Sequence, residues 1–417
     1  MRLRKTITTI VATAILLAGW QLFAVIANQP ELIPSLPRLV RTLCEWLVSG
    51  SFYQSVGATI LRGILGMSIS FVCAIGMAGL FARFEWVYEL FRPLLAIMRS
   101  IPVISFILLA LIFLNPESIP LMIAFLTMFP LLTENLTRGI IDLRPGLSIM
   151  ARQFHIKRSN VLFQIIYPQL KPFLYSGLAS AAGFGWRAII MGEVLSQCAF
   201  GIGSEMKRAQ NFIAVPELLA WTIVAVFISF FFDKGISKVT DITPKISFAN
   251  EDQTIPTPTL SVLDTKDISY QYGIQHFSHS FQKGIIYGIS APSGKGKTTL
   301  LNLIGGILLP TEGEIHPTRH FGIATIFQQP QLLPYLTAEE NIILPLSSFL
   351  TEEKARRIAQ KHLQEMEMEP FGNRYPKELS YGQQQRIAIA RALAYPSPLL
   401  LICLLYTSPS PRDPKTS

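Results

Sequence analysis

Charged residues and cysteines are both scarce in this chain of 417 residues. Only 15% of the residues are charged, whereas 50% are hydrophobic, which is more apolar than an ordinary soluble protein. No C-x-x-C pair occurs, and no histidine stands at metal-ligand spacing from a cysteine. The four cysteines are therefore predicted to be packing residues in a reducing or membrane setting, not a metal or redox centre; they are Cys44, Cys73, Cys198 and Cys403.

Acidic residues are outnumbered, since 36 Lys and Arg face 27 Asp and Glu and give a formal net charge of +9. A basic balance is compatible with nucleic-acid binding, but these residues stand mostly at the ends of apolar segments instead of along one stripe. Membrane topology explains that distribution better, and we expect no nucleic-acid partner.

Residues 1–240 contain apolar runs long enough to cross a bilayer. Six spans can be drawn, at about 7–27, 55–82, 93–114, 118–138, 172–198 and 214–232. Residues 35–49 between the first two suit a short interfacial helix. The first run lacks a small-x-small cleavage site, which indicates a retained span with Arg2, Arg4 and Lys5 on the cytoplasmic side.

The loop between the fourth and fifth spans fixes the orientation. Residues 138–171 carry Asp142 against six basic residues, which places this loop and the C-terminal half in the cytoplasm; the six are Arg138, Arg144, Arg152, Lys157, Arg158 and Lys171. We therefore expect a multi-pass protein of the cytoplasmic (inner) membrane. The loop, residues 142–172, combines a short amphipathic helix with an apolar stretch that ends in proline. It is either a knob for a cytoplasmic partner or an ordinary basic loop.

Three charged residues stand within the predicted spans: Arg62, Arg187 and Glu193. Each is costly there unless it is paired or shielded. Arg187 and Glu193 are separated by roughly 240° around a helix, so they cannot easily pair with each other. Two interpretations remain open, a polar lining of a translocation path, or snorkelling and inter-helix contact.

The composition changes after Ile236. Residues 245–259 are polar with two prolines and indicate a linker. Residues 284–290 then predict a buried strand, which runs directly into A-P-S-G-K-G-K-T at 291–298, and an apolar helix follows. Strand, loop and helix in this order are the context of a phosphate-binding P-loop.

Each residue of this loop has a physical role in nucleotide binding. Gly294 and Gly296 allow backbone N–H groups to converge on phosphate oxygens at a helix N-terminus. Lys297 supplies a charge to the β- and γ-phosphates, and the Thr298 hydroxyl is a ligand for Mg²⁺. Ala291 replaces the usual first glycine. The predicted cofactors are ATP and Mg²⁺, and the remaining loop residues predicted to bind are Ser293, Lys295 and Thr299.

Residues 379–383, L-S-Y-G-Q, resemble the LSGGQ signature of ATP-binding-cassette (ABC) ATPases, with Tyr381 at the central glycine. Gln328 in F-Q-Q resembles the Q-loop glutamine of that family, which implies a second metal contact. Tyr272 looks like the aromatic residue that stacks on adenine. The resemblance implies a nucleotide site shared between two chains, because the signature of one ATPase closes over the phosphate loop of the other; the signature residues are Ser380, Gly382 and Gln383.

The membrane half resembles the permeases of binding-protein-dependent importers, particularly the nitrate, sulfonate and taurine group, through residues 99–114 and 186–196. Residues 142–172 include a segment that resembles the EAA loop of these permeases, and this resemblance ends at Pro168. Its motif is degenerate, since Ile149, Met150 and His155 stand where Glu, Ala and Gly are usual.

The resemblance implies an all-α polytopic membrane domain of about six helices followed by an α/β P-loop ATPase domain. The implied boundaries are 1–244 for the permease, 245–259 for the linker, 260–402 for the ATPase and 403–417 for a tail unlike the family. The implied activity is ATP-driven import of a small anion or organic solute. Its partners would be the membrane, a second copy of the chain or another ATPase subunit, and an extracytoplasmic solute-binding protein. Alternatives are a non-hydrolysing nucleotide sensor or scaffold, and an exporter, which the short cytoplasmic loops disfavour.

The acidic pair of the family's Walker B strand is missing. After Pro398 the family has four apolar residues and then Asp-Glu, whereas here residues 399–402 are followed by Cys403 and Leu404. No catalytic residue can be assigned, and we expect no ATP hydrolysis at a normal rate by this chain. Either the sequence is truncated, frame-shifted or joined to foreign sequence near Cys403, or the ATPase domain is a natural half that binds nucleotide without turnover.

Overall fold

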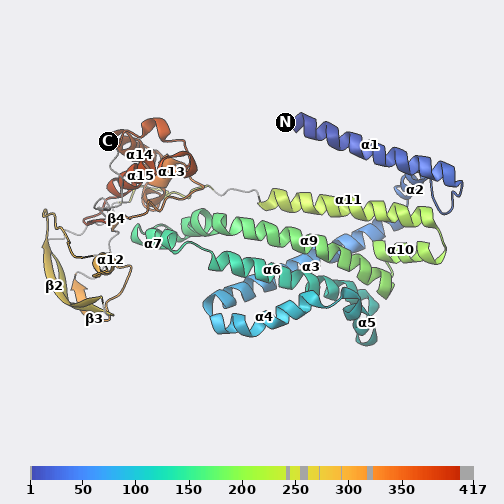
Figure 1. Cartoon of the computed structure of the whole chain (residues 1–417), viewed down its shortest axis with the longest axis horizontal. Helices are drawn as coiled ribbons and strands as arrows, with labels where there is room; N and C mark the ends of the chain where they lie inside the picture. Colours follow the sequence, from blue (N-terminus) through green and yellow to red (C-terminus); the bar gives the residue numbers. More distant parts are fainter. Residues whose placement is uncertain are drawn as a thin grey trace, which may run out of the picture. The chain divides into compact units, whose positions relative to one another are not determined.

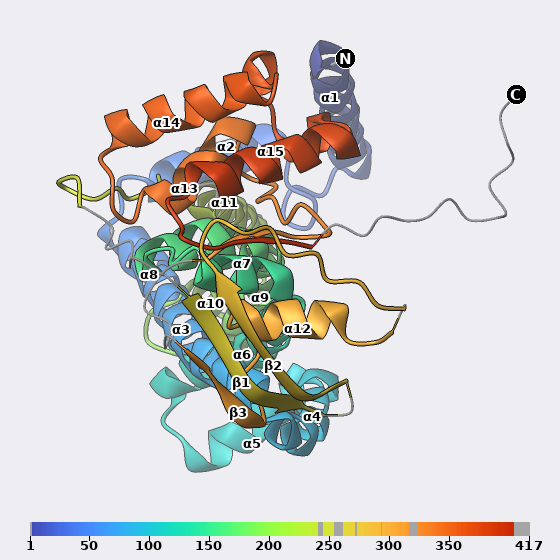
Figure 2. The ribbon, with the colours of Figure 1, turned by 90° about the vertical axis from the view of Figure 1, so that its left-hand side faces the viewer.

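The computed structural model describes residues 2–240, 245–253, 262–271, 273–292, 294–316 and 323–403. The chain forms two compact units (Figures 1 and 2). One comprises Met1–Asp142 with Leu170–Ile242, and the other comprises Leu143–Gln169 with Thr243–Ser417. The loop between two membrane helices therefore belongs to the same unit as the P-loop.

The first unit is all helical. Its elements in chain order are α1 (Arg2–Ala27), α2 (Leu36–Trp46), α3 (Gly50–Arg83), α4 (Glu85–Ser100), α5 (Val103–Phe113), η1 (Pro116–Ser118), α6 (Ile119–Ile141), α9 (Tyr167–Ser196), α10 (Ile202–Asn211) and α11 (Val215–Thr240).

Fewer helices than predicted are clearly able to span a membrane. Among the described residues, four are long and apolar enough: Gly50–Arg83, Pro116–Ile141, Arg158–Ser196 and Val215–Ile236. A fifth span is possible only if α4 and α5, which meet at 93°, count as one. The expected class, a polytopic helical domain, is confirmed, with four or five spans instead of about six.

Two of the predicted spans account for the difference. The run at 93–114 is broken because Pro102 lacks a backbone N–H and disfavours helical geometry at Ile101, which has φ −70° and ψ 130°. The N-terminal run does form α1, but the apolar part of α1, Val11–Ala27, is short and lies at the lower limit for crossing a hydrocarbon core of roughly 30 Å.

Small residues allow the membrane helices to pack closely. A Cβ atom on Gly66 of α3 would lie 2.6 Å from the Cβ of Ala124 in α6. Ala74 and Ala78 of α3 belong to the same buried cluster as Ala181 of α9. Close backbone approach is how helices associate when the surroundings are as apolar as the side chains.

The second unit contains two small sheets and several helices. β1 (Val262–Tyr270) pairs antiparallel with both β2 (Ile274–Gln282) and β3 (Glu312–His316). β4 (Ala324–Ile326) and β5 (Leu400–Ile402) form a parallel pair. The helices are α7 (Pro145–Gln153), α8 (Arg158–Asn160), η2 (Val161–Ile166), α12 (Lys297–Ile304), α13 (Ala338–Leu346), α14 (Glu352–Glu365), η3 (Glu369–Phe371), η4 (Pro376–Glu378) and α15 (Tyr381–Ala394).

Two apolar cores hold this unit together. α12 lies beside the three-stranded sheet (Figure 2). Leu300, Leu303 and Ile304 of α12 belong to one buried cluster with Leu263 and Ile268 of the sheet. The larger core joins α13, α14 and α15 to β4 and to the segment that carries α7.

The buried strand predicted at 284–290 does not form. Residues 285–290 have no strand assignment, and Ile286 is 98% exposed. A cavity of about 500 Å³ is lined by residues 284–287 and by the end of β5. Because a strand needs a neighbour for its hydrogen bonds, an apolar segment without a paired strand among the described residues stays irregular.

Candidate functional site

The predicted phosphate loop leads into α12 with the expected backbone geometry. Gly294 and Gly296 have φ values of +82° and +81°, which glycine adopts without a steric penalty. The Nζ atom of Lys297 donates hydrogen bonds to the carbonyl oxygens of Ala291 (2.5 Å) and Pro292 (3.0 Å). The ammonium group thus holds the loop closed at the N-terminus of α12, where free N–H groups favour an anion.

The other loop positions are placed as follows. The Lys295 N–H donates to the carbonyl oxygen of Pro292 at 3.3 Å. Thr298 is exposed and Thr299 is half-buried on the first turn of α12. Ser293 and Tyr272 lie outside the described residues, so their predicted contacts with phosphate and adenine stay predictions.

A second cavity, of about 310 Å³, brings together the two predicted metal ligands, Thr298 and Gln328. Cys403 also lines it, because β4 and β5 run parallel and end at the same edge, where the Cys403 N–H donates to the carbonyl oxygen of Ile326 at 2.9 Å. Hydroxyl and amide oxygens suit Mg²⁺. Among the described residues, neither cavity lined by Thr298 includes an Asp or Glu.

The signature residues gather at the N-terminus of α15. Ser380 caps this helix, since its hydroxyl accepts a hydrogen bond from the Gln383 N–H at 3.3 Å. The Gln383 side chain accepts one from the Ser380 N–H at 2.9 Å, which completes a capping box. A Cβ on Gly382 would meet nothing within 4 Å. These residues line neither of the two cavities, so their part in nucleotide binding stays a prediction.

A hydrogen bond that no local sequence pattern predicts links the signature to the Q-loop. The hydroxyl of Tyr381, which occupies the central glycine position, donates to the carbonyl oxygen of Gln328 at 2.9 Å. The Gln385 side chain donates to the carbonyl oxygen of Phe327 at 3.5 Å, at the limit of a hydrogen bond. Replacement of the family's glycine by tyrosine was the visible signal.

The loop that follows α6 is built into the larger core of the second unit. Phe154 is fully buried, meets the Tyr395 ring edge-on at 5.2 Å and lies 5.5 Å from the Arg391 guanidinium. Burial lowers the pKa of Arg391 to about 10 and raises the pKa of Tyr395 to about 12. Both groups therefore keep their ordinary charge at pH 7, and Arg391 donates to the carbonyl oxygens of Pro330 and Gln331 at 2.8 Å.

Asn160 makes a second junction in this core. Its side chain donates to the Ser247 carbonyl oxygen and to the Ser347 hydroxyl, both at 2.8 Å, and accepts from the Ser247 N–H. Of the two interpretations of residues 142–172, these contacts favour the knob over a free loop. No sequence pattern marks Asn160 or Phe154 beyond their place in that segment.

The degenerate positions of this loop have clear environments. Met150 is buried and Ile149 is half-buried, so apolar residues suit both places. His155 has φ +47°, in the left-handed region that glycine favours, and this is the position where the EAA motif that the loop resembles has glycine. Partial burial also lowers the pKa of the His155 imidazole.

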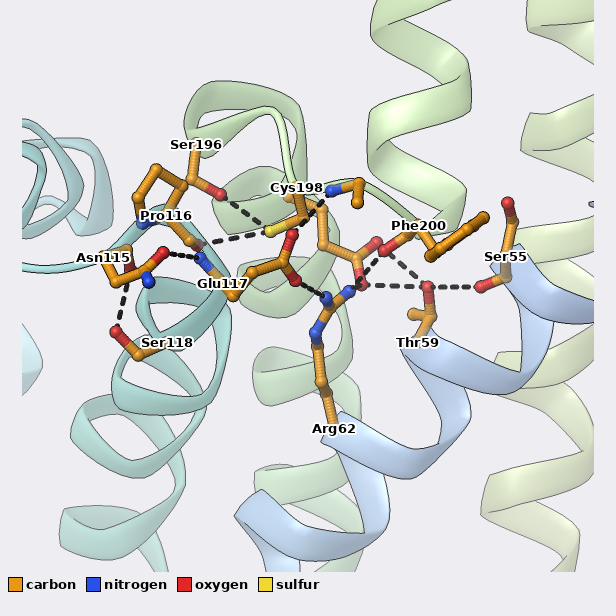
Figure 3. Close-up of polar contacts among 12 residues, drawn as sticks. Ser55, Thr59, Arg62, Asn115, Pro116, Glu117, Ser118, Ser196, Cys198 and Phe200 are labelled. Carbon is orange, nitrogen blue, oxygen red and sulfur yellow. Dashed lines mark hydrogen bonds and ion pairs between the residues drawn. The ribbon is translucent and has the colours of Figure 1, made fainter.

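Arg62 lies at the centre of a cluster of polar contacts in the membrane unit (Figure 3). Glu193 is fully buried and accepts hydrogen bonds from Arg62 (2.7 Å), the Thr59 hydroxyl (2.9 Å) and the Gly203 N–H (2.9 Å). Arg62 also donates to Glu117 at 2.7 Å, so it bridges α3, α9 and the turn at η1. Arg62 and Glu193 thus form the inter-helix contact that was one of the two interpretations.

Two family models match this chain, one in each half. A family model described as "Binding-protein-dependent transport system inner membrane component" matches residues 54–233. A model described as "ABC transporter" matches residues 274–402.

Similar proteins cover the ATPase half. The "Uncharacterized ABC transporter ATP-binding protein MJ0796" of Methanocaldococcus jannaschii is 39% identical over 150 residues, which are 31% of this chain and 64% of that protein. The "Spermidine/putrescine import ATP-binding protein PotA" of Nitrosomonas europaea is 33% identical over 157 residues, or 34% of this chain and 44% of that protein. The chain thus spans less than two thirds of the length of these relatives.

A solved structure of MJ0796, a dimer in a post-hydrolysis state bound to ADP and Pi, is similar to part of this chain. The two are 35% identical with a TM-score of 0.31, and the similar region covers 34% of this chain and 72% of that one.

With the helical spans and the phosphate loop already described, the two family matches establish that this multi-pass membrane protein is a fused ABC transporter polypeptide, with a binding-protein-dependent permease domain at residues 54–233 and an ABC ATPase domain at residues 274–402.

Proposed function

We propose that this chain belongs to a system that imports a small anion or organic solute, of the nitrate, sulfonate or taurine type, across the cytoplasmic membrane at the expense of ATP. The observation that carries the proposal is the position of residues 143–169. They connect two membrane helices, α6 and α9, yet Phe154 and Asn160 are built into the ATPase core. A nucleotide-driven change in that core therefore reaches the permease through one covalent chain.

The proposed nucleotide is ATP with Mg²⁺, bound by the loop at 293–299. Lys297 would hold the β- and γ-phosphates, Thr298 and Gln328 would contact the metal, and Tyr272 would stack on adenine. The signature at the N-terminus of α15 would serve the phosphate loop of a second copy of this chain or of another ATPase subunit. The proposed domains are 1–244, 245–259 and 260–402, with the ATPase on the cytoplasmic side.

Import is favoured over export because the matched permease family is the binding-protein-dependent one. An extracytoplasmic binding protein would then deliver the solute. A second candidate, a non-hydrolysing nucleotide sensor, is favoured by one observation. Cys403 occupies the strand end where the family has its metal-organising carboxylate, and no acid lines the adjacent cavities among the described residues.

Nucleotide binding and uptake test the two candidates separately. The purified chain in lipid nanodiscs should bind trinitrophenyl-ATP, and Lys297→Ala should weaken that binding at least tenfold through loss of charge-assisted contacts with phosphate. Lys361→Ala, which removes an exposed lysine of α14, is the matched control.

Cells that express the chain with candidate binding proteins are then assayed for uptake of labelled nitrate, taurine and ethanesulfonate. Uptake that depends on Lys297 supports import. If the chain binds nucleotide but none of the three solutes is taken up, the import proposal is rejected and the nucleotide sensor is supported. If the chain binds no nucleotide, both proposals are refuted.

A further inference from the structure

Of the three charged residues within the predicted spans, Arg187 is the one that forms no ion pair among the described residues. It lies in α9, nine residues before the end of the helix at Ser196. At 1.5 Å per residue this is about 14 Å from the extracytoplasmic end, near the middle of a hydrocarbon core of roughly 30 Å. Its side chain is exposed, and among the described residues it makes no hydrogen bond or ion pair.

The two faces of α9 have different surroundings. One face is buried in its own unit through Ala181, Trp186, Ile189 and Glu193. The other face carries Arg187 together with exposed residues that follow the helical repeat of 100° per residue. These residues are Gly183, Phe184 (61% exposed) and Met191 (42% exposed).

A guanidinium at this depth cannot remain against lipid without a large desolvation cost. Ionisable groups at the middle of a membrane therefore face a partner or a water-filled cavity. Glu193 is not the partner, because it is on the opposite face and is held by Arg62. Since no carboxylate among the described residues pairs with Arg187, a water-filled passage with apolar walls would supply the environment that the guanidinium needs, and such walls strengthen the attraction of a cation for an anion.

Arg62 cannot serve the same purpose. Its guanidinium is shared between Glu117, Glu193 and the Phe200 carbonyl oxygen, and with two carboxylates the cluster has an excess of negative charge (Figure 3). An entering anion would be repelled by that cluster. Arg187 presents a fixed fork of donors that matches the oxygens of a planar or tetrahedral oxyanion.

We infer that Arg187 lines the translocation path and binds the anionic group of the transported solute. The inference rests on the proposed import function and narrows its substrate to an oxyanion, such as a sulfonate or nitrate, and excludes cationic solutes.

Direct binding measurements test this without any need for hydrolysis. The purified full chain in nanodiscs is titrated calorimetrically with sodium nitrate and sodium ethanesulfonate, and with choline chloride as the cationic control. We expect Arg187→Gln to weaken binding of the better anion at least tenfold and Arg187→Lys to weaken it less, because lysine keeps the charge but loses the fork. Arg92→Gln, at an exposed arginine of α4, is the matched control.

Unchanged affinity in Arg187→Gln, or no anion binding by the wild type, overturns the inference. Binding of trinitrophenyl-ATP by the same samples reports on the ATPase separately, so failure of the anion site is distinguishable from failure of the proposed function.

A thiol-labelling experiment separates a watery path from a lipid headgroup as the neighbour of Arg187. Arg187→Cys is made in a background that lacks the exposed Cys44 and Cys73, and the parent background measures labelling of Cys198 and Cys403. The membrane-impermeant anion methanethiosulfonate ethylsulfonate reacts with thiols in water. We expect labelling of Arg187→Cys at least tenfold faster than the parent; labelling no faster than the parent assigns this face to lipid and refutes the inference.

Discussion

Removal of Arg62 should destabilise the membrane unit strongly, because it leaves Glu193 buried without its counter-charge. Glu193 has no exposed surface, and after Arg62→Met only the Thr59 hydroxyl and the Gly203 N–H remain to stabilise the carboxylate. Loss of one partner of a buried ion pair costs about 3–5 kcal/mol. For a unit of this size each kcal/mol lowers the melting temperature by about 2–4 °C, so we expect a decrease of roughly 6–20 °C.

Thermal unfolding of the full chain in detergent, followed by tryptophan fluorescence, measures this shift. Trp186 and Trp221 are buried in the same unit and report on its packing. The double variant Arg62→Met/Glu193→Leu should recover most of the loss, since no buried charge is left unpaired. Arg92→Gln, at an exposed site, should change the melting temperature little. A melting temperature of Arg62→Met equal to that of the wild type, or a double variant no more stable than the single one, would refute the buried pair.

Three further predictions concern the ATPase unit. Phe154→Ala should leave a cavity beside Tyr395 and cost about 3–5 kcal/mol, whereas Phe154→Leu should cost less than half of that; equal near-ultraviolet circular dichroism melts of both variants would contradict this. His155→Gly should remove left-handed strain and raise stability by about 1 kcal/mol at pH 8. Because partial burial lowers the pKa of His155, the unfolded chain binds the proton more readily than the folded chain. The free energy of unfolding of the wild type should therefore fall as the pH decreases below about 6.5. Chemical unfolding of the glycine variant should give a flatter dependence of this free energy on pH, and parallel curves for the two proteins would exclude His155 as the cause. Cys403→Asp should make trinitrophenyl-ATP binding several-fold more dependent on Mg²⁺, because it adds a carboxylate to the cavity that Thr298 lines. The uncharged Cys403→Asn should leave the Mg²⁺ dependence unchanged. Equal Mg²⁺ dependence of the two variants would place residue 403 outside the metal site.

The backbone geometry of the predicted phosphate loop follows from a local sequence pattern, and phosphate binding by this loop stays a prediction. Phosphate binding needs glycines at left-handed positions, a lysine and a helix N-terminus within a few residues, and Gly294, Gly296 and Lys297 satisfy that requirement. The capping box of α15 is equally local, since Ser380 and Gln383 are three residues apart. Such patterns depend little on the rest of the fold.

The strand predicted at 284–290 failed for the opposite reason. Its apolar residues fit a buried strand, but a strand exists only where a second segment supplies hydrogen bonds, and that segment is distant in sequence. The spans show a related limit. Hydropathy over 93–114 describes how apolar the run is and not whether its backbone is continuous, although Pro102 marked the break.

Hydropathy alone does not predict which of the three charged residues within the spans form ion pairs. The angular argument correctly excluded a pair between Arg187 and Glu193, because it needs only the helical repeat. The partnership of Arg62 with Glu117 depends on how the turn at η1 packs against α3, which no local pattern specifies. Two arginines of the same membrane unit therefore have opposite surroundings. The one surrounded by carboxylates connects the helices of the bundle, and the one without them is the arginine that we propose as the anion ligand.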